Sequence, residues 1–146
     1  MNHAFSVRTT GQGLYDVTAD VQRCVTAEHA SEGVCAVLVR HTSASLTIQE
    51  TAAPAVRRAL EAWLSRLVAE NDPLYTHTDE GPDDMPSHIR AALTCPSLSI
   101  PIMRGALALG AWQGVYLWEH RRGSRTRSLV VSVMPFLADA RAGAGG

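Results

Sequence analysis

The chain contains no lysine: all 13 of its basic residues are arginine. Any chemistry that needs a lysine amine, such as a Schiff base or the P-loop of a nucleotide hydrolase, is therefore excluded. Arginine still permits two-point hydrogen bonding to phosphate or carboxylate groups. The formal charge is -1 and the basic residues are scattered. The sequence thus lacks the concentrated positive charge typical of nucleic-acid-binding proteins, and we expect no nucleic-acid partner.

Long apolar runs and paired cysteine motifs are also missing. No uncharged apolar stretch approaches the roughly 18 residues of a membrane-spanning helix. The N-terminus, Met1 to Phe5, does not resemble a secretory signal, so we expect a cytoplasmic protein with no membrane partner. The three cysteines, Cys24, Cys35 and Cys95, form no Cys-x-x-Cys pair and have apolar neighbours. The sequence therefore predicts three buried free thiols.

What the chain does have is enough apolar residues for one ordinary domain. It is 146 residues long and 46% hydrophobic, which is sufficient for a single core. We interpret residues 1–140 as one domain. The glycine- and alanine-rich end, 141–146, is predicted to be a disordered tail.

The hydrophobic pattern predicts short strands in hairpins, one long helix and two short helices. In the long helix, 54–68, apolar side chains recur at helical spacing, and Trp63 is predicted to lie in the core. The short helices are predicted over 18–29 and 88–95, the second with Ser87 as its N-cap. Because strands follow one another without regular alternation with helices, the pattern favours an α+β fold built on an antiparallel β-sandwich.

The densest polar stretch runs from Arg40 to Glu50, directly after the apolar run from Val34 to Val39. It contains His41 and four hydroxyl side chains, a pattern typical of a site mounted at the end of a buried strand. Each hydroxyl alone is more simply explained as a hydrogen bond at a strand edge or helix cap. The stretch as a whole favours a functional interpretation.

A second polar segment, residues 71–87, has little periodicity, three prolines and five acidic residues. A loop of this length in a compact domain is usually functional or disordered, and its apolar residues favour an ordered lid over a pocket. His77 lies in the loop and His88 follows it. Together with His41, these histidines and the nearby carboxylates are suited to Zn²⁺, Mn²⁺ or Mg²⁺, provided that the fold brings them together.

For each histidine alone, a hydrogen-bonded structural imidazole is as plausible as a metal ligand. The metal interpretation therefore depends on the group and not on any one ring. The remaining histidines are interpreted as surface residues: His3, His29 and His120.

Three motifs stand out along the chain: His41 to Thr47, Glu80 to Ile89 and Gly110 to Gly114. Taken in this order, they closely resemble the motifs of the YjbQ family, also called the secondary thiamine-phosphate synthase enzyme family. The resemblance covers nearly the whole chain. Three motifs in the right order make it much more specific than any single one.

The resemblance implies a small α+β sandwich that assembles as a homotrimer, with the motif residues near a cleft or subunit boundary. It also implies thiamine-phosphate synthase activity, a transfer that joins a thiazole phosphate to a pyrimidine diphosphate with loss of pyrophosphate. The partner would then be a small phosphorylated metabolite. Candidate catalytic residues are His41, Glu50, His88 and Gln113. Candidate substrate contacts are Thr42, Ser43, Arg90 and Trp112. Candidate metal ligands are His41, His77 and His88.

Three positions depart from the family pattern. Gln49 and Ala111 stand where the family usually has asparagine and threonine, and Arg90 stands where it tends to have lysine. Ala111 removes a hydroxyl, so a hydrogen bond at that position is lost or is made by another residue. Arg90 keeps the positive charge, but a guanidinium would bond phosphate through two N–H groups where a lysine ammonium acts as a point charge.

Two interpretations compete with an enzyme. One is a non-catalytic trimeric module that binds a small anionic metabolite in the same pocket. The other is a purely structural trimer, which accounts for the aromatic strand from Trp112 to Trp118 that we expect a monomer to expose. The structural interpretation does not explain the histidine and hydroxyl cluster, so we place it last.

Overall fold

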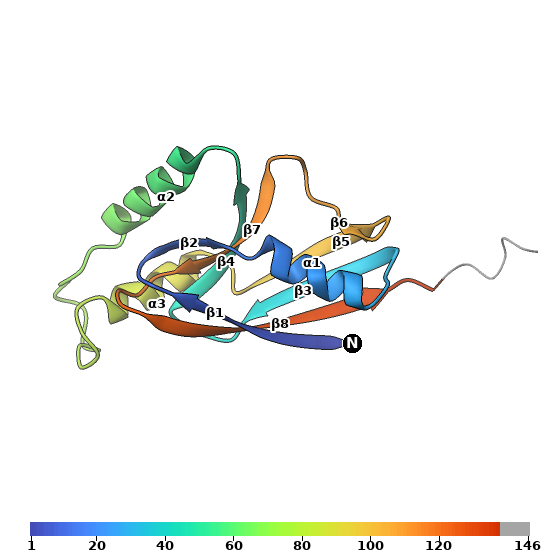
Figure 1. The fold of residues 1–146 in the computed structure, drawn as a ribbon. Coiled ribbons are helices and arrows are strands. Elements are labelled where there is room, and N and C mark those ends of the chain that lie inside the picture. Colours follow the sequence, from blue (N-terminus) through green and yellow to red (C-terminus); the bar gives the residue numbers. More distant parts are fainter. Residues whose placement is uncertain (138–146) are drawn as a thin grey trace, which may run out of the picture.

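Two antiparallel sheets form the body of the molecule in a computed structural model that describes residues 1–137 (Figure 1). One sheet has five strands in the order β1-β8-β3-β5-β6, and the other has three in the order β2-β7-β4. The strands are β1 (Asn2–Thr9), β2 (Gly13–Asp16), β3 (Glu32–Val39), β4 (Ala44–Glu50), β5 (Ser97–Met103), β6 (Ala106–Leu107), β7 (Gln113–Glu119) and β8 (Arg125–Pro135). The helices are α1 (Thr18–Ala27), α2 (Pro54–Leu67) and α3 (Asp84–Leu93).

The predicted fold class is confirmed, because the strands are antiparallel and the helices do not alternate regularly with them. Helix α2 has 14 residues and the other two have 10 each, so one long and two short helices were also predicted correctly. None of the helices in residues 1–137 has both the length and the apolar character needed to cross a membrane. The predicted disordered tail, 141–146, lies outside the described residues.

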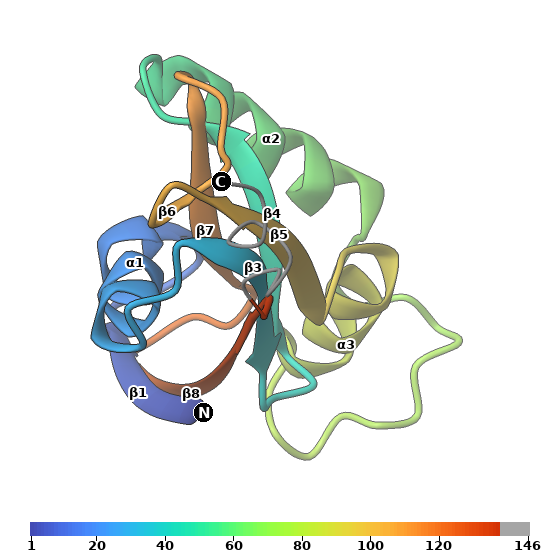
Figure 2. The ribbon, with the colours of Figure 1, turned by 90° about the vertical axis from the view of Figure 1, so that its right-hand side faces the viewer.

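The main core lies between the two sheets and beneath α1. On β3, Cys35, Val37 and Val39 face this core while Leu38 is exposed, as the two-residue period of a strand requires. Helix α1 contributes Val21 and other apolar side chains on its inner face. Full burial of one such side chain contributes about 1.5–3 kcal/mol. Figure 2 shows α1 on the opposite side of the molecule from α3.

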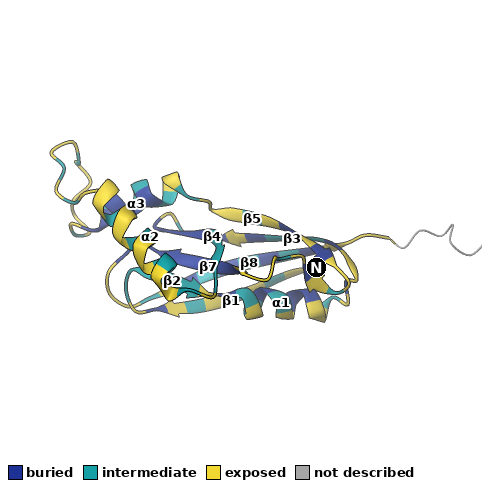
Figure 3. Ribbon diagram, turned by 90° about the horizontal axis from the view of Figure 1, so that it is seen from above, coloured by how far each residue is buried: buried dark blue, intermediate teal, exposed yellow. Residues whose placement is uncertain are grey.

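Helix α2 is less buried than its apolar pattern predicts. Only Leu64 is fully buried on it, whereas Trp63 and Leu67 are 53% and 56% exposed, and much of the helix faces solvent in Figure 3. The space beneath α2 is filled by Trp118 from β7. The prediction that Trp63 lies in the core is therefore wrong. One cysteine was also misplaced: Cys95 is exposed, while the other two are buried.

Helix α3 begins at Asp84, three positions before the predicted cap at Ser87. Pro86 is compatible with this start, because the first N–H groups of a helix have no partner within the helix. The earlier start places Asp84 and His88 four residues apart on one face. Because α3 packs beside β4, this face lies next to the chain that leads into β4.

Candidate metal centre

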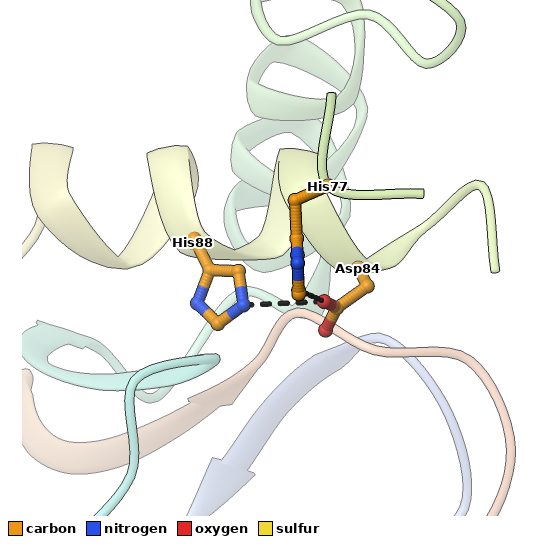
Figure 4. Close-up of side chains that lie close together, drawn as sticks. All are labelled: His77, Asp84 and His88. Carbon is orange, nitrogen blue, oxygen red and sulfur yellow. Dashed lines mark hydrogen bonds and ion pairs between the residues drawn. The ribbon is translucent and has the colours of Figure 1, made fainter. Parts of the chain in front are cut away.

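Three side chains from the loop after α2 and from α3 converge: His77, Asp84 and His88. One ligand atom from each lies within 4.8 Å of the others. The Nε2 atoms of His77 and His88 lie 2.6 and 3.2 Å from Oδ2 of Asp84, and Figure 4 shows both rings directed at this carboxylate. Two imidazole nitrogens and one carboxylate oxygen are a ligand set that Zn²⁺ and Mn²⁺ accept.

A hydrogen bond to the backbone determines which nitrogen of His88 carries hydrogen. Nδ1 lies 3.0 Å from the carbonyl oxygen of Thr42, and because a carbonyl oxygen only accepts, Nδ1 must donate. In the neutral ring, Nε2 is then an unprotonated acceptor, and it faces the Oδ2 acceptor of Asp84. Two acceptors at this distance repel one another unless a cation binds them both. The cation is either a proton on the ring or a metal ion.

The carboxylate of Asp84 is buried, and its two oxygens have different partners. The residue is 1% exposed. Oδ1 accepts a hydrogen bond of 2.8 Å from Nη1 of Arg121, which leaves Oδ2 for the two histidines. His77 is half-exposed and His88 is partly buried. Both rings are thus more exposed to solvent than the carboxylate that they contact.

Behind this group lies a buried network that joins the ends of β7 and β8. Arg127 donates to Glu119 and to the hydroxyl of Ser43, and Thr9 also donates to Glu119. Burial raises the pKa of Glu119, but the hydrogen bonds from Arg127, from the Arg121 N–H and from Thr9 outweigh it and hold the pKa below its usual value. Glu119 is therefore ionised and fixed in position.

A similar balance applies to Asp83, beside Asp84 at the start of α3. Burial raises its pKa, and the hydrogen bonds from the Arg121 side chain and the Arg122 N–H lower the pKa by more. Both carboxylates at the start of the helix thus have Arg121 as a partner.

His41, predicted as the third histidine ligand, is not part of the group in residues 1–137. Its Nε2 accepts a hydrogen bond of 2.8 Å from the N–H of Ser128. Burial and then the charge of Arg127 lower the pKa of His41, so the ring is neutral at pH 7 and its hydrogen is on Nδ1. Asp84 occupies the place in the cluster where the sequence suggested His41. A functional role for His41 stays a prediction.

The predicted substrate-binding residues of the first two motifs do not point into the cluster of His77, Asp84 and His88. The contact from Thr42 to His88 is made by its backbone, and Ser43 accepts from Arg127. Arg90 is 3% exposed, and its Nη2 donates to the carbonyl oxygen of Val68. Its guanidinium is thus held in the interior, away from solvent phosphate. Contacts between these three side chains and a substrate stay predictions.

His120, interpreted from the sequence as a surface residue, is fully buried. Its Nε2 lies 2.9 Å from the hydroxyl of Ser45. Burial, followed by the charge of Arg90, lowers the pKa of His120 to about 3. The surface interpretation is wrong because the neutral ring is compatible with the interior.

Glu50, Trp112 and Gln113 lie at the other end of the small sheet. Glu50 ends β4, whereas His88 contacts the chain just before β4 begins. The strand from Ala44 to Glu50 spans about 20 Å at 3.3 Å per residue. The predicted site residues of one chain therefore form two groups, one at each end of β4.

The third motif is a tight turn that leads into β7. Gln113 is the cross-strand partner of Glu50 and accepts a hydrogen bond from the N–H of Gly110. Trp112 is 67% exposed. Gly114 is needed here because a Cβ would lie 2.5 Å from Cγ2 of Thr51. The expectation that the whole aromatic strand is exposed in a monomer is wrong, since Tyr116 and Trp118 are buried within the chain.

A sequence profile described as UPF0047 protein YjbQ-like matches residues 3–135, which include all three motifs. The chain belongs to the YjbQ family. It is 47% identical over 127 residues to the UPF0047 protein sll1880 of Synechocystis sp., covering 87% of this chain and 86% of that protein. It is 41% identical over 101 residues to the UPF0047 protein YjbQ of Escherichia coli O157:H7, covering 69% and 72%.

Solved structures of YjbQ proteins share the fold. One is the crystal structure of an uncharacterised conserved protein of the yjbq/upf0047 family from Clostridium acetobutylicum. It is 33% identical, with a TM-score of 0.83 over 90% of this chain and 99% of that chain. The family membership and the α+β fold thus agree with the motif resemblance.

Two residues of the cluster and its surroundings were not predicted as parts of the site. Asp84 was counted only among the carboxylates near the histidines, because the loop was predicted to continue to Ser87. An aspartate four residues before His88 is the spacing of two side chains on one helical face. Arg121 was not identified, because its 37-residue separation from Asp84 gave no local signal.

Proposed function

We propose that His77, Asp84 and His88 bind a divalent metal ion and that this centre acts on a small phosphorylated metabolite. The observation that carries the proposal is the convergence of three potential ligand atoms, with Nε2 of His77 and Nε2 of His88 both directed at Oδ2 of Asp84. A ligating histidine commonly donates its other N–H to a backbone carbonyl, as His88 does to Thr42. Three protein ligands leave coordination positions open, as in catalytic metal sites.

Zn²⁺ and Mn²⁺ fit this donor set better than Mg²⁺. Mg²⁺ prefers six oxygen ligands, whereas two of the three donors here are nitrogens. The partial exposure of both rings leaves room for a substrate oxygen on the solvent side.

We propose more specifically that the centre catalyses a thiamine-phosphate synthase reaction. The family resemblance and the charges near the cluster support this proposal. A bound divalent cation neutralises the charge of a diphosphate leaving group. The protein supplies carboxylates at this place, and Arg121 is paired with Asp83 and Asp84. The ligands therefore hold the cation, and the acidic side chain of Glu80, which lies beside Arg121, disfavours phosphate in its absence.

We further propose that the protein acts as a homotrimer. Trp63, Leu67 and Trp112 are large apolar side chains that the single chain leaves more than half exposed, which is typical of surfaces that bind another chain. In the proposed head-to-tail contact, the third motif of one copy lies beside the metal centre of the next. Contacts of this kind close into rings when the rotation permits, and a ring of three is the smallest above a dimer.

A non-catalytic module that binds a small anionic metabolite is the second candidate. The observation that favours it is the position of the predicted proton-transfer residue, Glu50, at the far end of β4 from His88. In addition, the Nε2 of His41 already accepts from Ser128. Neither predicted proton-transfer residue is thus free beside the proposed metal centre of its own chain.

The two candidates are separated by complementation of a strain that lacks thiamine-phosphate synthase. We expect the unmutated protein to restore growth and His88→Ala to fail, with both proteins folded and of equal mass in solution. His29→Asn is the matched control, because His29 has a φ of 50°, a conformation that asparagine tolerates better than alanine does. If the unmutated protein binds metal and a phosphorylated ligand but does not complement, the binding module is the better account.

A further inference from the structure

Arg121 connects the hairpin between β7 and β8 to the start of α3. All three nitrogens of its guanidinium have acceptors on α3 or on the loop before it. Nη1 bonds Oδ1 of Asp84 at 2.8 Å, and Nε bonds Oδ2 of Asp83 at 2.9 Å. Nη2 bonds the carbonyl oxygen of Glu80 at 2.9 Å. The residue is 7% exposed, so these bonds form away from competing water.

The backbone of Arg121 is held as firmly as its side chain. Its N–H donates to Oε1 of Glu119 at 3.0 Å. Glu119 is fully buried and paired with Arg127, which in turn donates to Ser43. The backbone of Arg121 is therefore anchored to buried side chains at the end of β7 and the start of β8. This anchoring fixes the position of its guanidinium.

Arg121 determines which oxygen of Asp84 faces the histidines. With Oδ1 bonded to the guanidinium, the carboxylate cannot turn both oxygens toward a cation between His77 and His88. We infer that Arg121 is a positioning residue that makes Asp84 a one-oxygen ligand and thereby sets the coordination number and metal preference of the site. This inference rests on the proposed metal centre.

The chemical consequence is selectivity among divalent ions. A one-oxygen carboxylate with two imidazoles completes a four-coordinate site with one further ligand, the arrangement that suits Zn²⁺. A carboxylate that binds through both oxygens raises the coordination number and suits larger ions that prefer oxygen. Arg121 thus favours Zn²⁺ over Mn²⁺ at this site.

Loss of Arg121 also leaves Asp83 and Asp84 without their buried partner, which destabilises any fold. The test therefore needs a measurement that would not change if Arg121 only stabilised the fold. Co²⁺ provides it, because its visible absorption is strong in four-coordinate sites and weak in six-coordinate ones. The probes are Co²⁺, Zn²⁺ and Mn²⁺ alone, titrated into the chelator-treated full-length protein.

The variants are Arg121→Met, Arg121→Lys and the control Arg122→Met. The side chain of Arg122 is about half-exposed and pairs with Glu70, so its loss leaves Asp84 unchanged. For Arg121→Met we expect Co²⁺ affinity to fall by about 10- to 100-fold, the usual cost of losing a residue that orients a ligand. The Co²⁺ absorption per bound ion falls too, and the preference for Zn²⁺ over Mn²⁺ decreases. Lysine keeps the charge but lacks the planar guanidinium that bonds Asp83 and Asp84 together, so Arg121→Lys gives intermediate values.

The possible results separate the inference from the proposed metal centre. If the unmutated protein does not bind Co²⁺, the metal centre itself is wrong and the inference is overturned with it. If the unmutated protein binds and Arg121→Met has the same spectrum and metal preference, only the inference is overturned, even where all affinities fall together. Should Arg121→Met not fold, Asp83→Asn removes the charge from the other carboxylate that holds Arg121. A smaller change in the same direction is then expected, and an unchanged spectrum overturns the inference.

Discussion

Asp84 and His88 lie one helical turn apart on α3, with Oδ2 of the first 3.2 Å from Nε2 of the second. Both atoms are acceptors when the ring is neutral, because Nδ1 of His88 donates to Thr42. The contact makes sense chemically when a cation is shared. This relationship, and not the number of histidines in the sequence, is the basis of the proposed metal centre.

The first prediction concerns the ligands. Asp84→Asn keeps the size of the side chain but removes the charge and places an amide group beside Arg121 and the histidines. Loss of one of three ligands should lower zinc affinity by more than about 100-fold, beyond the 10- to 100-fold effect of an outer residue. Competition with a chelating dye measures this affinity. An unchanged affinity would place the metal elsewhere, and His3→Ala serves as a control for the loss of one imidazole.

The second prediction concerns pH. His120 has its pKa lowered from 6.5 to about 3 in the folded chain, so between these values the unfolded chain binds more protons. The free energy of unfolding should therefore fall as pH drops below about 6.5, by up to about 1.4 kcal/mol per pH unit. The pKa of His41 is also lowered, so it acts in the same direction.

Urea unfolding of chelator-treated protein at one concentration, repeated from pH 8 to pH 5, measures this slope. His120→Asn should be less stable at pH 7 but should show a smaller slope in this range. A slope equal to that of the unmutated protein would mean that His120 is not buried as a neutral ring. The pKa values of Glu119 and Asp83 are lowered in the folded chain, so their ionised carboxylates stabilise it. This stabilisation is lost only at lower pH, as the carboxylates become protonated.

The third prediction concerns the buried ion pair between Arg127 and Glu119. Arg127→Met leaves a fully buried carboxylate without its main partner, and we expect a loss of about 3–5 kcal/mol. Arg122→Met removes an exposed pair with Glu70 and should cost about 0–1 kcal/mol. Equal losses in the two variants, measured by chemical unfolding, would show that the network around Glu119 does not stabilise the fold in this way.

Much of the fold was predictable because it depends on local periodicity. The continuous apolar run in β3 and the apolar spacing in α2 indicated their secondary structure correctly. The exposure of Trp63 was not predictable in the same way, because it depends on where α2 lies relative to β7. Trp118 occupies the space that the helix pattern alone would give to Trp63.

The candidate site was predictable only in part. His77 and His88 were identified, and the structure brings them together. Asp84 was not proposed as a ligand because the helix was predicted to begin only after Ser87, which left Asp84 in the loop. Arg121 could not be found from spacing, since its contact with Asp84 depends on how α3 packs against the sheet.

The fourth prediction concerns assembly. Light scattering at micromolar concentration should give the mass of three chains, because the exposed Trp63, Leu67 and Trp112 are covered by other copies in the proposed assembly. If the third motif of one copy serves the metal centre of the next, Trp112→Ala should lower activity and leave zinc affinity unchanged. A monomer with full activity would contradict both statements.

The most direct test of the metal centre is a crystal structure of the zinc-treated protein, measured with X-rays on both sides of the zinc absorption edge. We expect an anomalous peak about 2.0–2.2 Å from Nε2 of His77, Nε2 of His88 and Oδ2 of Asp84. Oδ1 of Asp84 should remain bonded to Arg121. A fully occupied zinc site on other residues, or no peak between these three side chains, would contradict the proposed metal centre.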